Sequence, residues 1–167
     1  ISGDVVPVLC GSAIKNTGIV TLMNTIDRFF PSPLDVGTYK LKNIKSGAEE
    51  NRSYDASLPF SAQVFKTVAD PFVGKISMFK AMSGSISPDS EVFNSNKERK
   101  ERLSALFLQR GKKQLPMTRL IAGDIGAVAK LQFTTTGDTL CDAANLVCFD
   151  ALKFPEPNIA MAIEPKS

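Results

Sequence analysis

Few residues in this chain are of the types that perform acid–base or nucleophilic chemistry. The 167 residues include no histidine, which removes the commonest general base. The three cysteines, Cys10, Cys141 and Cys148, show no CxxC spacing, so we expect reduced, mostly buried thiols and no metal site or disulfide framework. The carboxylates of Asp138 and Asp142 have no histidine partner and are interpreted as turn residues. The sequence therefore predicts no catalytic residue.

A turn of small residues is the first candidate for ligand binding. Gly11, Ser12 and Ala13 follow the apolar run 5–10, which has the composition of a short buried strand. Glycine and alanine at such a turn leave the space beside the backbone unfilled. An ordinary structural turn has the same composition, so the tripeptide alone does not decide between the two interpretations.

Clustered positive charge is the second candidate. Twenty basic and seventeen acidic side chains give a formal charge of +3. The basic residues gather between positions 97 and 113, where they are Lys97, Arg99, Lys100, Arg102, Arg110, Lys112 and Lys113. Only Glu98 and Glu101 oppose them there. The cluster indicates either a solvated hairpin face or a surface that contacts nucleic-acid phosphates, and both interpretations stay open.

The elements that position these residues change character along the chain. Apolar side chains recur at helical spacing from Ile19 to Phe30, with Asn16 and Thr17 as capping residues before them and Pro31 after them. A strand at 5–10, a turn and this helix are typical of the edge of an α/β sheet. Residues 37–57 are polar and predict a linker with an exposed hairpin or loop.

From position 58 onward the pattern predicts β-structure. Short runs of alternating apolar residues are separated by glycine or proline at near-even intervals. Many short strands with such turns favour a closed antiparallel β-barrel, because closure removes exposed strand edges. No apolar run approaches the roughly 18 residues of a membrane span, so we expect no membrane contact.

Several segments resemble elongation factor G, a ribosomal translocation GTPase. Thr134–Leu140, Asp70–Lys75 and Phe154–Pro157 are similar to segments of its second domain. Pro7–Ala13 looks like the last strand and fifth guanine-nucleotide motif of its GTPase domain, and Phe30–Val36 continues the likeness. The resemblance implies a mainly β fold, in which a closed antiparallel β-barrel of the translation-protein type follows an α/β remnant of a GTPase domain.

The resemblance also implies a domain organisation. Residues 1–36 would be the terminal strand and helix of the GTPase domain, and 37–57 a linker or exposed loop. Residues 58–157 would be the β-barrel second domain, and 158–167 a strand leading to a third domain. The chain would then be a fragment of a larger translational GTPase.

Site residues and partners follow from the same resemblance. Gly11, Ser12 and Ala13 would contact guanine, with GTP or GDP and Mg bound by the parent protein. The fragment has no GxxxxGK[ST], DxxG or NKxD motif, so we expect it to hold no cofactor and to be inactive as a GTPase. The candidate contacts to small-subunit ribosomal RNA are Lys97, Arg99, Lys100, Arg102, Lys112 and Lys113. We expect a cytoplasmic protein and a monomeric fragment.

Two alternatives remain beside this interpretation. The chain could be a stand-alone RNA- or ribosome-binding β-barrel module. It could also belong to an elongation factor G-like paralogue with a different ribosomal role, because residues 38–57 and 94–102 depart from the family's pattern. The tetracycline-resistance ribosomal protection proteins are a poorer match at Asp70–Lys75.

Overall fold

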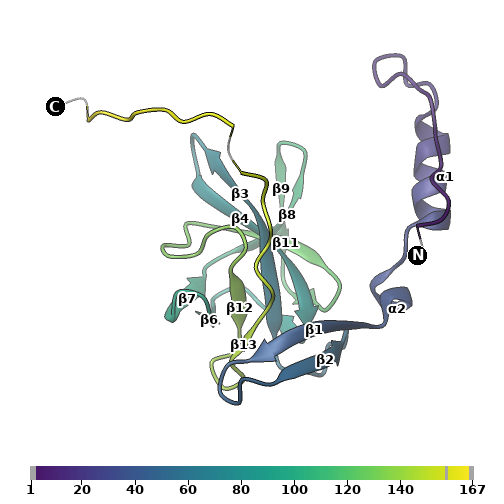
Figure 1. The fold of residues 1–167 in the computed structure, drawn as a ribbon. Coiled ribbons are helices and arrows are strands. Elements are labelled where there is room, and N and C mark those ends of the chain that lie inside the picture. The colour runs from purple at the N-terminus through teal and green to yellow at the C-terminus, as the bar shows by residue number, and fades with distance from the viewer. Residues whose placement is uncertain (1–2, 157, 166–167) are drawn as a thin grey trace.

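The computed structural model describes residues 3–156 and 158–165, and the fold in these residues is mainly β (Figure 1). Two helices precede the strands, α1 (Ile19–Phe29) and α2 (Pro33–Val36). The strands are β1 (Thr38–Asn43), β2 (Glu49–Ser53), β3 (Ser61–Asp70), β4 (Gly74–Ser83), β5 (Ser85–Ile86), β6 (Ser90–Asn94), β7 (Arg99–Leu103), β8 (Leu106–Arg110), β9 (Lys113–Met117), β10 (Leu120–Ile121), β11 (Ile125–Ala129), β12 (Thr139–Cys141) and β13 (Val147–Cys148).

An eight-stranded antiparallel sheet forms the body of the domain. Its hydrogen-bonded order is β7-β6-β12-β3-β4-β11-β8-β9. The two long strands β3 and β4 pair at its centre, with a register shift between Val64 and Lys66 that bends the sheet. The main core packs inside the curve and is made of Phe60, Ala62, Val64, Phe79, Ala81, Ile86, Val92, Leu103, Leu106, Leu120, Val128, Leu131 and Leu140. The predicted alternation of Phe60, Ala62 and Val64 is confirmed.

The predicted closed barrel is not seen as a continuous ladder. The sheet is open, because β7 and β9 each pair on one side only, with β6 and β8 respectively. Strands β5 and β10 pair with each other in a separate two-stranded sheet. The sheet is therefore an open half-barrel curved around its core (Figure 1).

The polar segment 37–57 forms a hairpin. Strands β1 and β2 pair along five positions, and β1 also pairs with β13. Leu41 of β1 is buried with Cys141, Val147 and Phe149 in a second apolar cluster. Tyr39 of β1 packs against the same cluster, so two side chains of a mostly polar segment hold the hairpin on the end of the larger sheet.

The amino-terminal segment differs from the prediction. Helix α1 forms as the spacing indicates, but residues 5–10 form no strand. A strand requires a hydrogen-bonded neighbour, and none lies beside these residues in the part of the chain that the structure describes. In the described residues this end of the chain is a helix preceded by an extended, exposed segment, and the predicted α/β remnant is not shown. Gly18 caps the helix with a φ of 77°, and the side chains of Asn16 and Thr17 do not.

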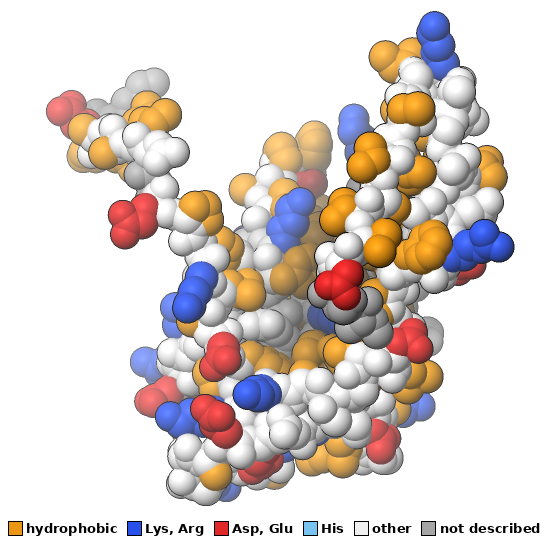
Figure 2. Space-filling view, turned by 45° about the vertical axis from the view of Figure 1, so that its right-hand side comes forward, with side chains coloured by type: hydrophobic (Ala, Val, Ile, Leu, Met, Phe, Trp, Pro, Cys, Tyr) orange, Lys and Arg blue, Asp and Glu red, His pale blue; other side chains and the backbone are white. Residues whose placement is uncertain are grey.

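Helix α1 exposes its apolar face. None of its residues is buried. Its exposed large apolar side chains include Met23, Ile26 and Phe29. Figure 2 shows orange side chains gathered over this helix. The next turn, α2, begins with a capping box in which Ser32 and Asp35 exchange hydrogen bonds.

The carboxyl-terminal segment also differs from the prediction. Residues 159–163 have a strand-like sequence but form no strand, and their large apolar side chains are exposed. Pro157 and the last two residues of the predicted 158–167 strand lie outside the described residues. None of the helices in the described part of the chain is long and apolar enough to span a membrane.

Candidate functional site

The small-residue turn is a closed loop between the extended segment and α1. Ser12 and Thr17 exchange two backbone hydrogen bonds of 3.0 Å each. A Cβ atom on Gly11 would lie 2.7 Å from the carbonyl oxygen of Thr17, so closure of the loop itself requires glycine there. The glycine is thus explained without any ligand.

The same turn leaves room for a flat ligand. A cavity of about 240 Å³ lies beside it and is lined by Leu9, Cys10, Gly11, Ala13, Gly18, Ile19 and Leu22. The backbone amide of Ser12 is used within the loop, whereas that of Ala13 donates to no acceptor among the described residues. The cavity and the Ala13 amide lie in the same turn, and whether they hold a ligand stays a prediction.

The basic residues predicted as one cluster belong to two different hairpins. Those of the β6–β7 hairpin have partners: Lys100 lies 2.7 Å from Glu91, and Arg102 lies 3.0 Å from Asp89. The Arg99 guanidinium lies 5.8 Å from the centroid of the Phe133 ring. These cations face neighbouring acids or an aromatic ring.

The β8–β9 hairpin carries the remaining basic residues. Arg110, Lys112 and Lys113 are exposed at its tip, and no ion pair forms with them within residues 3–156 and 158–165. Arg110 and Lys113 stand directly opposite each other across the two strands. Figure 1 shows this hairpin projecting from the body of the sheet.

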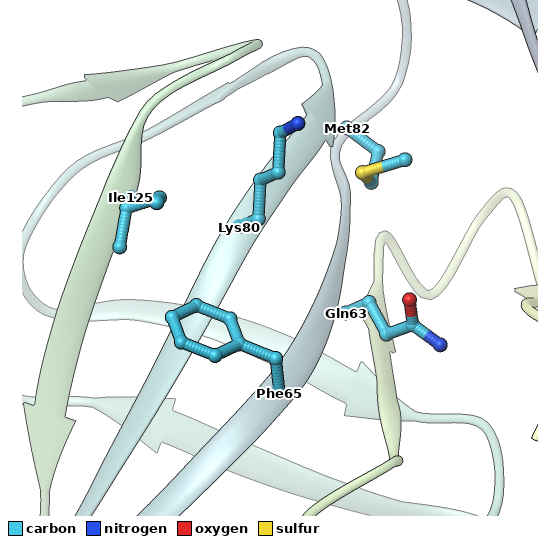
Figure 3. A pocket seen from close by; sticks show the side chains of 5 residues that line it. All are labelled: Gln63, Phe65, Lys80, Met82 and Ile125. Carbon is cyan, nitrogen blue, oxygen red and sulfur yellow. The ribbon is translucent and has the colours of Figure 1, made fainter. Parts of the chain in front are cut away.

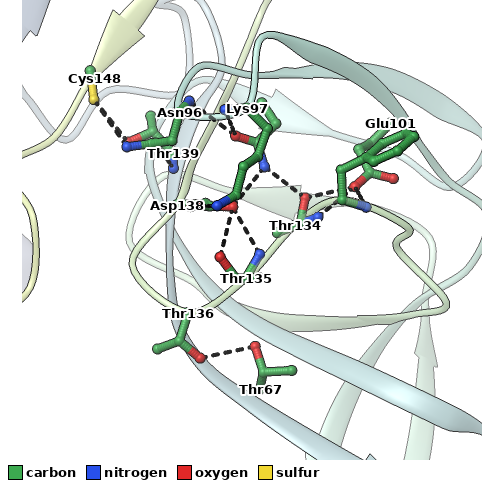
Figure 4. Close-up of polar contacts among 12 residues, drawn as sticks. Thr67, Asn96, Lys97, Glu101, Thr134, Thr135, Thr136, Asp138, Thr139 and Cys148 are labelled. Carbon is green, nitrogen blue, oxygen red and sulfur yellow. Dashed lines mark hydrogen bonds and ion pairs between the residues drawn. The ribbon is translucent and has the colours of Figure 1, made fainter.

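Two buried carboxylates organise the loop between β11 and β12 (Figure 4). Glu101 of β7 accepts hydrogen bonds from the backbone amides of Gln132, Phe133 and Thr134 and from the Thr134 hydroxyl, at 2.8 to 3.0 Å. These bonds tie the edge strand β7 to the segment that follows β11, where no backbone ladder exists.

Asp138 is the second buried carboxylate, and the prediction that it is a turn residue is confirmed. Gly137 has a φ of 96°, and the amide of Thr135 donates to the Asp138 carboxylate at 2.8 Å. The side-chain amide of Asn94 donates to the same carboxylate at 2.9 Å, and the Lys97 ammonium lies 3.9 Å from it. The run of threonines and Gly-Asp is thus a structural junction between β6, β7 and β12.

The segment Asp70–Lys75 forms the tip of the hairpin between β3 and β4. The Asp70 carboxylate accepts hydrogen bonds from the amides of Phe72 and Val73, each 2.9 Å long. These two bonds hold the pKa of Asp70 below its ordinary value, the bond from Val73 most strongly. The Phe72 side chain is 95% exposed at the tip.

One surface feature escapes sequence analysis. An open groove of about 410 Å³ lies on the outer side of β3, β4 and β11 and is lined by Gln63, Phe65, Lys80, Met82 and Ile125 (Figure 3). The Lys80 ammonium lies 5.0 Å from the centroid of the Tyr54 ring. Phe65 and Ile125 point outward from their strands and line this groove. The sequence does not reveal that they lie close together, because this depends on how the strands pair.

Comparison with known proteins identifies the domain. The fold defines a β-rich domain of the translation-factor kind: a protein-family model described as elongation factor G domain 2 matches residues 59–143, just over half of the chain. The chain belongs to the elongation factor G domain 2 family. The matched residues begin before β3 and end after β12, so they cover the curved sheet.

A solved structure has the same fold. A crystal structure of a protein from Thermus thermophilus matches 85% of this chain with 24% sequence identity and a TM-score of 0.57. The chain spans 19% of the length of that protein.

Proposed function

We propose that this chain is part of a ribosomal translocase-type GTPase of the elongation factor G kind, and that its β-rich domain docks the parent protein on small-subunit ribosomal RNA. The family match over residues 59–143 carries the proposal. The exposed cations on a projecting hairpin support contact with RNA phosphates. In this proposal β5, β10 and the Glu101 hydrogen bonds complete the curved sheet into a barrel.

The amino-terminal segment would couple this domain to a GTPase domain. Its Gly11–Ala13 turn would contact the guanine of GTP or GDP, and residues elsewhere in the parent protein would hold the phosphates and Mg. The Ala13 amide and the adjacent cavity support this assignment. The proposal includes a cytoplasmic location and a monomeric 167-residue chain. The role proposed for this chain itself is docking on the ribosome.

Sedimentation with isolated small ribosomal subunits tests the docking function. We expect the chain to sediment with the subunits at low salt and to be released as salt rises, because phosphate contacts displace counterions. Absence of the chain from the subunit pellet at low salt would contradict the docking function.

Calorimetry with GTP and Mg tests whether this chain contributes only the base contact of the nucleotide site. We expect no heat of binding to this chain at micromolar concentrations, because one base-contacting turn lacks the phosphate contacts that dominate nucleotide affinity. A micromolar Kd would show that this chain holds more of the site than the turn.

A further inference from the structure

The two hairpins that carry the basic residues differ in net charge. Residues 90–103, which form the β6–β7 hairpin, include four basic and three acidic side chains, and Asp89 just before β6 brings this region to no net charge. Residues 106–117, which form the β8–β9 hairpin, include three basic side chains and no acidic one. Their charge of +3 equals the formal charge of the whole chain.

The cations of the β8–β9 hairpin are placed unfavourably for the isolated domain. Arg110 and Lys113 form a cross-strand pair of like charge, and Lys112 stands beside them in the turn. Like charges directly opposite each other destabilise an antiparallel pair. A bound polyanion would relieve this repulsion, whereas Lys100 and Arg102 of the β6–β7 hairpin already have acidic neighbours at 2.7 and 3.0 Å.

The apolar residues of the hairpin support a binding role as well. Leu108 and Leu115 pair across β8 and β9 just below the charged tip and are 41% and 37% exposed. They are uncharged, so the positive charge of the hairpin is concentrated at its tip. A projecting hairpin with a cationic tip fits the phosphate backbone of a folded RNA.

We propose that the tip of the β8–β9 hairpin, Arg110, Lys112 and Lys113, is the RNA-contacting element of this domain, and that the β6–β7 cations are not. The inference rests on the proposed function in naming RNA as the partner. It narrows the candidate surface of six residues to one hairpin and adds Arg110 to it.

Two triple variants with the same change in charge test the proposal. The hairpin variant carries Arg110→Gln, Lys112→Gln and Lys113→Gln. The matched control carries Arg99→Gln, Lys100→Gln and Arg102→Gln, and it spares Lys97 because that side chain lies near the buried Asp138. Binding of the full 167-residue chain to small ribosomal subunits and to a labelled RNA stem–loop is measured over a range of salt concentrations.

The hairpin variant should lose at least about tenfold in affinity, and its salt slope should fall by roughly 2 to 3 units, since each phosphate contact contributes about 0.7 to 0.9. The control should change by less than about threefold under the same electrostatic rule. A charge-preserving variant, Arg110→Lys with Lys112→Arg and Lys113→Arg, should bind like the wild type. Thermal unfolding of every variant shows whether the domain stays folded.

Each result decides the matter. Equal losses in both triple variants, no loss in the hairpin variant, or failure of the charge-preserving variant to bind would overturn the proposal. Binding of the wild type to the stem–loop but not to subunits would reject ribosome docking, while the variants would still decide which hairpin contacts RNA. A wild-type chain that binds neither RNA nor subunits would overturn both proposals.

Discussion

At the scale of single residues, Glu101 holds the edge strand β7 to the loop before β12. Its carboxylate is buried and accepts four hydrogen bonds from the loop before β12. Glu101→Ala would leave the buried amide and hydroxyl of Thr134 and two partly buried amides without this acceptor, so we expect it to lower the free energy of unfolding by about 2–4 kcal/mol. The midpoint of urea unfolding measures this loss.

Glu91 provides a matched control on the neighbouring strand. Its carboxylate pairs with Lys100 at 2.7 Å, but both side chains are well exposed. Glu91→Ala should therefore change the free energy of unfolding by less than about 1 kcal/mol. Similar losses for the two variants would show that Glu101 acts only as another surface charge.

Asp70 predicts a pH dependence at the β3–β4 tip. The folded-state pKa of its carboxyl lies below the ordinary value, chiefly because of the hydrogen bond from Val73. The ionised form is therefore favoured by folding: the stabilisation is present above the ordinary pKa and is lost as pH falls through the folded-state pKa. Titration of the carboxyl signal by NMR should show this low pKa, and an unshifted value would contradict the two hydrogen bonds.

The sequence predicted interactions between residues close in the chain better than contacts between residues far apart in it. The Gly137–Asp138 turn was predictable because glycine and aspartate act within a few residues of themselves. The role of Glu101 was not, because its partner Thr134 lies 33 residues away. The basic residues near Glu101 likewise appeared as one cluster, since the pairing of Glu91 with Lys100 depends on the register of two strands.

At the scale of elements, we expect the like-charged pair at the tip of the β8–β9 hairpin to lower the stability of the folded domain. Arg110→Glu would replace the like-charged cross-strand pair with an opposite-charged one facing Lys113. We expect the free energy of unfolding to rise by about 0.2–1 kcal/mol at low salt, because the repulsion becomes an attraction. Affinity for RNA should fall in the same variant.

Urea unfolding and RNA titration of this one protein check both expectations. Added salt should shrink the stability gain, because it screens charges at an exposed tip. A variant that is less stable and still binds RNA normally would contradict the assignment of the tip to binding.

The alternating pattern predicted where strands form more reliably than it predicted which of their side chains are buried. In β3 the residues Ala62 and Val64 are buried as expected. In β11 the neighbours Ala127 and Val128 are both buried, because Ala127 packs with Ile76 and Phe107 on the opposite side from the main core. A strand covered on both faces loses the two-residue period that marks a single buried face.

At the scale of the whole molecule, the curved sheet should fold without the helix. No residue of α1 is buried, whereas Pro33 packs against the backbone at Gly123. Deleting residues 1–30 should therefore lower Tm by no more than about 2–4 °C, the shift expected for roughly 1 kcal/mol. Calorimetric unfolding measures this change, and a molten or insoluble product would place α1 in the core of the domain.

The missing strand at 5–10 explains the limit of sequence-based prediction at this scale. The apolar run has the composition of a buried strand, but none of the described strands pairs with it. The apolar pattern and the resemblance both predicted a strand at 5–10, but a strand forms only where a neighbouring strand supplies hydrogen bonds. The exposed side chains of Val5, Val6 and Val8 are the structural consequence.

Photo-crosslinking from the hairpin tip tests the central claim most directly. A photoreactive amino acid replaces Lys112 in one protein and Lys100 in a matched one, and each is irradiated with small ribosomal subunits. The account predicts a crosslink from position 112 to ribosomal RNA and little from position 100, because only the β8–β9 tip meets phosphates. Crosslinks to RNA from position 100 alone, or from neither position, would contradict it.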